Sequence, residues 1–271
     1  MCKPVIKWVG GKRQLLKELK ERLPKKYNRY FEPFIGGGAL FFDLKPLDAF
    51  INDSNPELVN LYRVVRDNVE ELIQDLKKYK NTDEYYYKIR NLDRDENKYK
   101  KLSNIEKASR FIYLNKSGFN GLYRVNSKGQ YNVPYGKYEN PKYLDEENLR
   151  ECSQHLKNTE IGNNDFTIIE NYVKKGDFVY FDPPYVPLNT TSSFTQYTKE
   201  GFDDDMQFRL KELCDYIDKI GGYFMLSNSY TEFVLDLYGE NYKNHTVTAN
   251  RAINCKATGR GKIKEVIITN Y

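Results

Sequence analysis

The fold of this chain is decided by the stretch Phe178-Val179-Tyr180-Phe181-Asp182-Pro183-Pro184-Tyr185. Its first half is short, aromatic and β-branched, which predicts a buried strand. Neither proline has an N–H to donate, so the chain must leave the sheet at Asp182 in an extended turn. Ligands of open α/β sheets bind in the crevice beyond the carboxyl ends of the strands. This turn is therefore a candidate active site, although Asp-Pro pairs also begin ordinary turns.

A second candidate site lies nearer the N-terminus. Residues 30–35 predict a short strand that runs into Gly36-Gly37-Gly38, where the backbone can approach a ligand closely. Residues 48–52 predict the next strand, which ends at Asp53. An acid that follows a glycine turn in this way binds ribose hydroxyls in dinucleotide-binding folds. The order strand, turn, helix, strand favours a nucleoside cofactor, whereas a glycine cluster alone is weak evidence.

The alternation of strands and helices stops after Asn55-Pro56, which predicts the start of a helix. That helix is expected to be long, with a buried stripe of Leu58, Leu61, Val65, Val69, Leu72 and Leu76. Residues 81–107 are highly charged and rich in tyrosine. We therefore expect a catalytic domain made of residues 1–55 and 159–271, and an inserted, mainly helical domain made of residues 56–158.

The expected insertion contains a candidate β-hairpin, residues 116–136, with its tight turn at Ser127-Lys128-Gly129. Its arginine, asparagine, glutamine and aromatic side chains suit hydrogen bonds to base edges and insertion between bases. A plain surface hairpin has the same pattern, so both interpretations stay open. Two later segments are also ambiguous: the polar loop 187–198 can close over a substrate or simply connect, and the basic turn 256–262 suits phosphates or solvent.

Composition argues against several classes of protein. The four cysteines have no C-x-x-C spacing and only two histidines exist, so we expect neither a metal site nor Cys/His catalysis. No segment approaches the roughly 18 continuous apolar residues of a membrane span, and no signal-peptide core follows Met1, so we expect a cytoplasmic protein. The net charge of +5 and the 24 tyrosines suit a nucleic acid, although 38 acids offset 43 bases and a coding bias also explains the tyrosines.

Four segments resemble, in this order, the Dam family of DNA adenine-N6 methyltransferases, most closely its DpnII-type modification enzymes. They are Lys7-Trp8-Val9-Gly10-Gly11-Lys12, residues 31–38, residues 119–136 and residues 182–185. The resemblance covers nearly the whole chain. It implies an α/β fold, with a Rossmann-like methyltransferase sheet that has helices on both faces and an inserted target-recognition domain that carries the hairpin. It also implies S-adenosylmethionine as methyl donor, double-stranded DNA as substrate and GATC as target.

The resemblance also implies roles for individual residues. The catalytic residues would be Asp182, Pro183 and Tyr185. The cofactor-binding residues would be Trp8, Lys12, Phe34, Gly36, Gly38, Asp53, Asp165, Phe166 and Asp182. The DNA-binding residues would be Lys7, Phe119, Asn120, Leu122, Arg124 and Pro134, with Phe119 as a wedge in the duplex and Lys7 near a flanking guanine. Residues 93–101 match the family less clearly and receive no role.

The chemistry of such a site can be stated from the residues. Hydrogen bonds from the adenine N6 amine to the Asp182 carboxylate and the Pro183 carbonyl would localise the nitrogen lone pair, and a fixed carboxylate would stabilise the positive charge that develops on nitrogen. The adenine would have to flip out of the duplex. Methylation of cytosine N4, methylation of RNA and a catalytically silent DNA-binding regulator are the alternatives. A paired restriction endonuclease fits this interpretation, and we expect a monomer.

Overall fold

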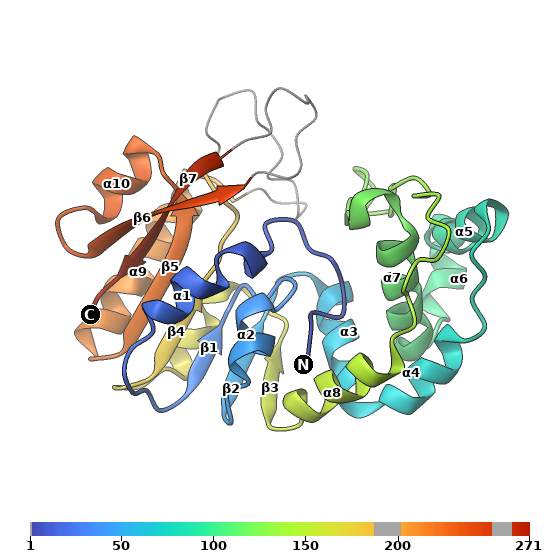
Figure 1. Ribbon diagram of the computed structural model, residues 1–271, viewed down its shortest axis with the longest axis horizontal. Helices are drawn as coiled ribbons and strands as arrows, with labels where there is room; N and C mark the ends of the chain where they lie inside the picture. Colours follow the sequence, from blue (N-terminus) through green and yellow to red (C-terminus); the bar gives the residue numbers. More distant parts are fainter. Residues whose placement is uncertain (1, 187–201, 251–261) are drawn as a thin grey trace. The chain divides into compact units, whose positions relative to one another are not determined.

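The computed structural model describes residues 2–186, 202–250 and 262–271 (Figure 1). The chain forms two compact units. The first comprises Met1–Gly11, Gly36–Leu47 and Asp53–Asn163, and the second comprises Lys12–Ile35, Asp48–Asn52 and Asn164–Tyr271. The domain division expected from the sequence, at residues 56 and 158, remains a prediction. The loop 187–198 and most of the basic turn 256–262 lie outside the described residues.

The second unit is built on a mostly parallel sheet. Its strands are β1 (Tyr30–Glu32), β2 (Ala49–Asn52), β4 (Phe178–Phe181), β5 (Tyr223–Ser229), β6 (Lys243–Asn250) and β7 (Lys262–Thr269). With β3 (Thr159–Gly162), the order across the sheet is β3-β2-β1-β4-β5-β7-β6 (Figure 1). Strands β1, β2, β4 and β5 pair in parallel, and β7 is antiparallel to both β5 and β6. The expected α/β class and Rossmann-like sheet are confirmed.

The strand order reverses between β1 and β4. From β1 the chain continues to β2 on one side, and later to β4 and β5 on the other side. The connections on the two sides of such a switch point diverge and leave a crevice at the carboxyl ends of the strands. Asp182 follows the end of β4 directly, so the tetrapeptide lies at the place where this architecture binds ligands.

Three of the parallel strands are fully buried, as expected for strands covered on both faces. Every residue of β1, β2 and β4 is buried. Helix α9 (Asp204–Lys219) lays its apolar face on the core, where Leu210, Leu213 and Ile217 share a cluster with β4 and β5. This rigid base holds the segments that leave the strand ends.

Leu15, Leu16, Leu19 and Leu23 fall on one helical face, which predicts a helix over residues 13–23. This helix and the long one expected after Asn55 both differ from the structure. Residues 13–23 form only a 3-10 turn, η1 (Lys12–Gln14), and a short helix, α1 (Leu16–Glu21). The long helix after Asn55 is two helices, α3 (Pro56–Asp67) and α4 (Val69–Leu76). Asn68 separates them with φ −136° and ψ 40°, which lies outside the helical region.

The first unit is mainly helical. Besides α3 and α4 it contains α2 (Ala39–Leu44), α5 (Asp83–Arg90), η2 (Asn91–Arg94), α6 (Glu96–Lys100), α7 (Asn104–Ser117), η3 (Phe119–Gly121) and α8 (Glu146–Leu156). The remaining elements of the second unit are η4 (Phe166–Asn171) and α10 (Glu232–Tyr238). No helix in the described parts of the chain has the length and apolar character to cross a membrane.

The expected hairpin is present, but it is irregular. Its arms meet at two isolated antiparallel bridges, Gly118 with Tyr135 and Val125 with Tyr131. The turn closes through a 2.9 Å bond from the Asn126 N–H to the Gln130 carbonyl, and Gly129 takes the left-handed conformation with φ 74°. With so few ladder bonds of its own, the hairpin depends on contacts with its surroundings.

The cap of α3 yields the first prediction. The Asn55 side chain accepts hydrogen bonds from the N–H groups of Glu57 and Leu58, at 3.0 and 3.3 Å. Replacing Asn55 by alanine leaves these donors unpaired and should lower the free energy of unfolding by about 1 kcal/mol. Asn68→Ala is the matched control, because Asn68 precedes α4 without a capping bond from its side chain. Urea denaturation measures both; equal losses would contradict the assignment of the cap.

Candidate active site

Asp182 forms a close ion pair at the end of β4. Its Oδ1 atom lies 2.7 Å from Lys12 Nζ, and the two side chains are only 21% and 6% exposed. Burial raises the pKa of the Asp182 carboxyl, while Lys12 opposes the rise and Glu265 adds to it. Lys12 therefore favours the ionised form of a carboxylate that its surroundings would otherwise tend to protonate.

Tyr185 is held from two sides. Its hydroxyl donates a 2.8 Å hydrogen bond to Glu265 Oε2, and Lys12 Nζ lies 4.5 Å from the centre of its ring. Glu265 belongs to β7 and is 8% exposed. Sequence reasoning missed this residue. The available signal was an acid at the start of the apolar run Val266–Ile268, a position where a buried charge needs a partner.

Side chains of β5 and α9 fix the backbone that follows the tetrapeptide. The Ser229 hydroxyl donates to the Val186 carbonyl at 2.8 Å, and Asn228 Oδ1 accepts from the Val186 N–H at 3.3 Å. Gln207 Nε2 donates to the Pro184 carbonyl at 3.4 Å. Asn228 and Gln207 are buried and also bond to each other at 3.2 Å. The turn therefore has a fixed course, as its two prolines predict.

Three further predicted residues lie together in the second unit. The rings of Phe34 and Phe166 stack at 5.1 Å with an interplanar angle of 28°. Phe166 is buried, whereas Phe34 is partly exposed. Asp165 begins η4 and accepts hydrogen bonds from Thr167, and its Oδ1 atom pairs with Arg209 at 3.2 Å. The Asp165 side chain remains 43% exposed and so keeps acceptor capacity toward a ligand.

The glycine turn and its acid are joined in the first unit. Gly36 donates its N–H to Asp53 Oδ2 at 3.1 Å, and Asn55 donates to Asp53 Oδ1 at 2.9 Å. Gly36 has φ 45°, and a Cβ atom there would lie 2.8 Å from the Trp8 ring. Burial raises the pKa of Asp53 to about 6, although both hydrogen bonds lower it. Trp8 itself is partly exposed and stacks on Tyr123 at 5.5 Å.

The predicted DNA-binding residues lie on or beside the hairpin of the first unit. Phe119 is 50% exposed, which is unusual for a large apolar side chain. Asn120, Arg124 and Pro134 are exposed as well, whereas Leu122 is partly buried. The backbone of Lys7 is held by Asn115 through two 2.8 Å hydrogen bonds, and its Nζ atom lies 5.3 Å from the ring centre of Tyr138.

Within the described residues, no three His, Cys, Asp or Glu side chains are arranged to hold a metal ion. The chain matches the family model for D12 class N6 adenine-specific DNA methyltransferase over residues 8–253.

Three relatives illustrate the similarity. The Type II methyltransferase M1.LlaDCHI of Lactococcus lactis subsp. cremoris is 48% identical over 99% of this chain and 95% of its own length. The Type II methyltransferase M.MjaIII of Methanocaldococcus jannaschii is 45% identical over 99% of both chains. The DNA adenine methylase of Escherichia coli K12 is 31% identical over 97% of this chain and 93% of its own. These matches confirm the resemblance read from the motifs: the chain belongs to the D12 class N6 adenine-specific DNA methyltransferase family and is an enzyme.

Proposed function

We propose that this enzyme transfers a methyl group from S-adenosylmethionine to N6 of the adenine in GATC within duplex DNA. In this proposal the adenine flips out of the helix, and its amine displaces the methyl group from sulfur directly. The main support is the partly buried Asp182 carboxylate, which lies at the sheet's switch point and pairs with Lys12 at 2.7 Å. We also propose that the protein is a monomer and has a companion restriction endonuclease.

The proposed catalytic residues act on the amine. The Asp182 carboxylate and the Pro183 carbonyl oxygen accept its two N–H groups and so direct the nitrogen lone pair away from the ring. Lys12 favours the ionised form of Asp182, and an ionised acceptor stabilises the positive charge that forms on nitrogen. The bound donor supplies an electrophilic methyl group on a positively charged sulfur. No side chain has to form a covalent bond.

The proposed donor-binding residues suit the parts of that molecule by their chemistry. The Asp53 carboxylate is an acceptor for ribose hydroxyls, and it is bound by the N–H of Gly36 in the glycine turn that also contains Gly38. The partly exposed ring of Phe34, backed by Phe166, suits an adenine face, and Asp165 suits the adenine amino group. Trp8, Lys12 and Asp182 complete this set.

In the proposed flipping step, the free-energy cost of extruding the base and the free energy gained by stacking it are of similar size. Extruding a base costs a few kcal/mol. Stacking on an aromatic ring returns about 1–3 kcal/mol, and the Tyr185 ring is held for this role by its bond to Glu265. The exposed Phe119 ring would fill the gap in the duplex. Lys7, Asn120, Leu122, Arg124 and Pro134 are the proposed contacts to the bases.

The proposal as a whole can be tested with an unmethylated plasmid. After incubation with the enzyme and S-adenosylmethionine, GATC sites should resist a nuclease blocked by adenine methylation and become sensitive to one that requires it. Asp182→Ala, assayed at saturating donor because Asp182 is also a proposed donor contact, should lose about 10²–10³-fold in kcat, since one fixed electrostatic contact to the reacting nitrogen is gone. Near-normal transfer by that variant would refute the role of Asp182, and methylation only outside GATC would refute the target.

Sequence discrimination should depend on Arg124. Arginine that binds guanine through two hydrogen bonds contributes about 1–3 kcal/mol of discrimination. Arg124→Ala should therefore keep residual activity but methylate near-cognate sites relatively better. The measurement is kcat/KM for duplexes that differ from GATC by one base pair. An unchanged ratio of cognate to near-cognate rates would remove Arg124 from base reading.

Donor binding should depend on pH through Asp53. Its pKa is raised to about 6, so the ionised acceptor predominates at neutral pH and protonation increases as the pH falls below about 6. Affinity for S-adenosylmethionine should then fall by up to about tenfold per pH unit. Calorimetric titration between about pH 5 and 8 measures this, and Asp53→Asn should bind weakly with a flat profile. The same slope in that variant would exclude Asp53 as its source.

A further inference from the structure

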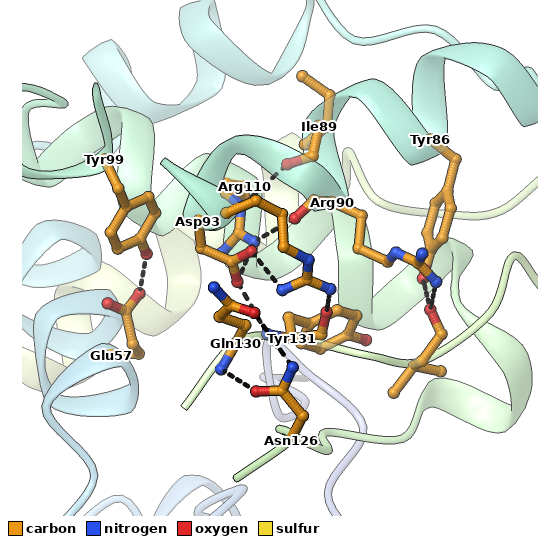
Figure 2. A network of polar contacts seen from close by, with 12 residues as sticks. Glu57, Tyr86, Ile89, Arg90, Asp93, Tyr99, Arg110, Asn126, Gln130 and Tyr131 are labelled. Carbon is orange, nitrogen blue, oxygen red and sulfur yellow. Dashed lines mark hydrogen bonds and ion pairs between the residues drawn. The ribbon is translucent and has the colours of Figure 1, made fainter. Parts of the chain in front are cut away.

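We infer that Asp93 and Arg110 are positioning residues for sequence recognition: they hold the hairpin in the orientation in which Arg124 reads DNA. This inference rests on the proposed function of the hairpin. Residues 93–101 carried no role in the sequence, and the structure shows Asp93 at the centre of a buried polar network between the hairpin, α5, η2 and α7 (Figure 2).

Asp93 ties the hairpin to α7. Its Oδ2 atom lies 2.7 Å from Nη2 of Arg110 and accepts a 2.8 Å hydrogen bond from the backbone N–H of Tyr131 (Figure 2). The Asp93 and Arg110 side chains are only 10% and 6% exposed. Arg94 binds the other backbone group of the same residue, because its Nη2 atom donates to the Tyr131 carbonyl at 2.6 Å. Both backbone groups of one hairpin residue are thus bound by consecutive residues of η2.

Arg110 connects Asp93 to helices α5 and α7. From its position in α7 it donates to the Ile89 carbonyl at 3.0 Å and the Arg90 carbonyl at 2.8 Å. Both carbonyls belong to the last turn of α5, where helix carbonyls have no partner within the helix. Arg110 therefore binds the end of α5 and Asp93 at the same time. A shift of Tyr131 would have to break its bond to Asp93 or move Asp93 away from Arg110.

The clamp, which consists of Asp93, Arg94 and Arg110, acts on Arg124 because side chains alternate between the two faces of the extended arm, residues 131–134. Tyr131 and Val133 point inward and are buried, so the residues between and after them, Asn132 and Pro134, face outward. The Asn132 side chain accepts a 2.7 Å bond from Arg124 Nε, and the two backbones are bonded at 3.0 Å. A slip of one residue in this arm would turn Asn132 inward and release the guanidinium.

A buried ion pair is a weak source of stability, because desolvation offsets most of its attraction. Its effect here is on geometry: the Arg110 guanidinium is held by the Ile89 and Arg90 carbonyls, and this limits the positions that the Asp93 carboxylate can take. Four backbone hydrogen bonds and two isolated bridges join the arms of this hairpin, so its arms alone fix their register only over a short length. The pair reinforces that register and ties it to the neighbouring helices.

The test compares Asp93→Asn with Tyr99→Phe in the full-length enzyme. The asparagine still offers an oxygen to Tyr131 but loses the charge that holds Arg110. Tyr99→Phe removes the 2.7 Å bond from the Tyr99 hydroxyl to Glu57 Oε2, which belongs to the same region but does not contact the hairpin backbone (Figure 2). For each variant, kcat/KM is measured on GATC and on duplexes changed at one base pair, together with the thermal midpoint and kcat on GATC.

Asp93→Asn should lose about tenfold of discrimination at the same base pair as Arg124→Ala, with kcat on GATC retained. The double variant Asp93→Asn/Arg124→Ala should lose no more than Arg124→Ala alone, because both changes act on one contact. Tyr99→Phe should lower only the thermal midpoint. Should Asp93→Asn fail to fold, Arg94→Ala removes the bond to the Tyr131 carbonyl from a more exposed side chain and should give the same loss.

The outcomes separate this inference from the function on which it rests. If Arg124→Ala lowers discrimination but a folded Asp93→Asn or Arg94→Ala does not, the hairpin reads bases and the clamp is irrelevant to it. Multiplicative losses in the double variant, or an equal loss of discrimination in Tyr99→Phe, would likewise overturn the positioning role. If Arg124→Ala itself changes nothing, the proposed function of the hairpin fails, and the clamp has nothing to position.

Discussion

The ion pair between Asp182 and Lys12 is the interaction on which the proposed chemistry of this enzyme depends. The fold takes Asp182 to the carboxyl end of a buried strand, where low exposure raises the pKa of its carboxyl. A protonated acid there would be a poorer acceptor and would carry no charge. Lys12, almost completely buried itself, provides the counter-charge at 2.7 Å. The sheet thus determines the position of Asp182, and Lys12 favours the ionised form of its carboxyl, which burial at that position disfavours.

The same lysine lies over the ring of Tyr185, whose hydroxyl is bound by Glu265. Asp182 and Glu265 bring two negative charges to this region and Lys12 brings one positive charge. In the proposed reaction, positive charge leaves sulfur and appears on nitrogen, so an excess of fixed negative charge favours both the bound donor and the transition state. Fixed groups are effective here because they need not reorganise as the charge moves, and the bonds from Asn228, Ser229 and Gln207 keep the following backbone in place.

Local patterns in the sequence were enough to predict the strand before Asp182, the acid after the glycine turn and the cap at Asn55, because each depends on neighbours in the chain. Contacts between distant residues were not predictable. Glu265 meets Tyr185 from 80 positions away, and Asp93 meets Tyr131 from 38. Strand β6 was also missed, because it pairs only with β7 and is mostly polar, so it lacks the apolar run that identified the inner strands.

The two ion pairs, Lys12–Asp182 and Asp93–Arg110, have different proposed roles. The carboxylate of the Lys12–Asp182 pair belongs to the proposed reaction itself, so its charge affects the rate directly. Neither side chain of the Asp93–Arg110 pair is a proposed DNA contact; the pair holds the backbone of Tyr131, and through Asn132 it sets the direction of Arg124. Each pair lies within its own compact unit. In the proposed mechanism, chemistry and recognition depend on separate sets of bonds, and a substitution in one set can change sequence preference without changing the charge of the other.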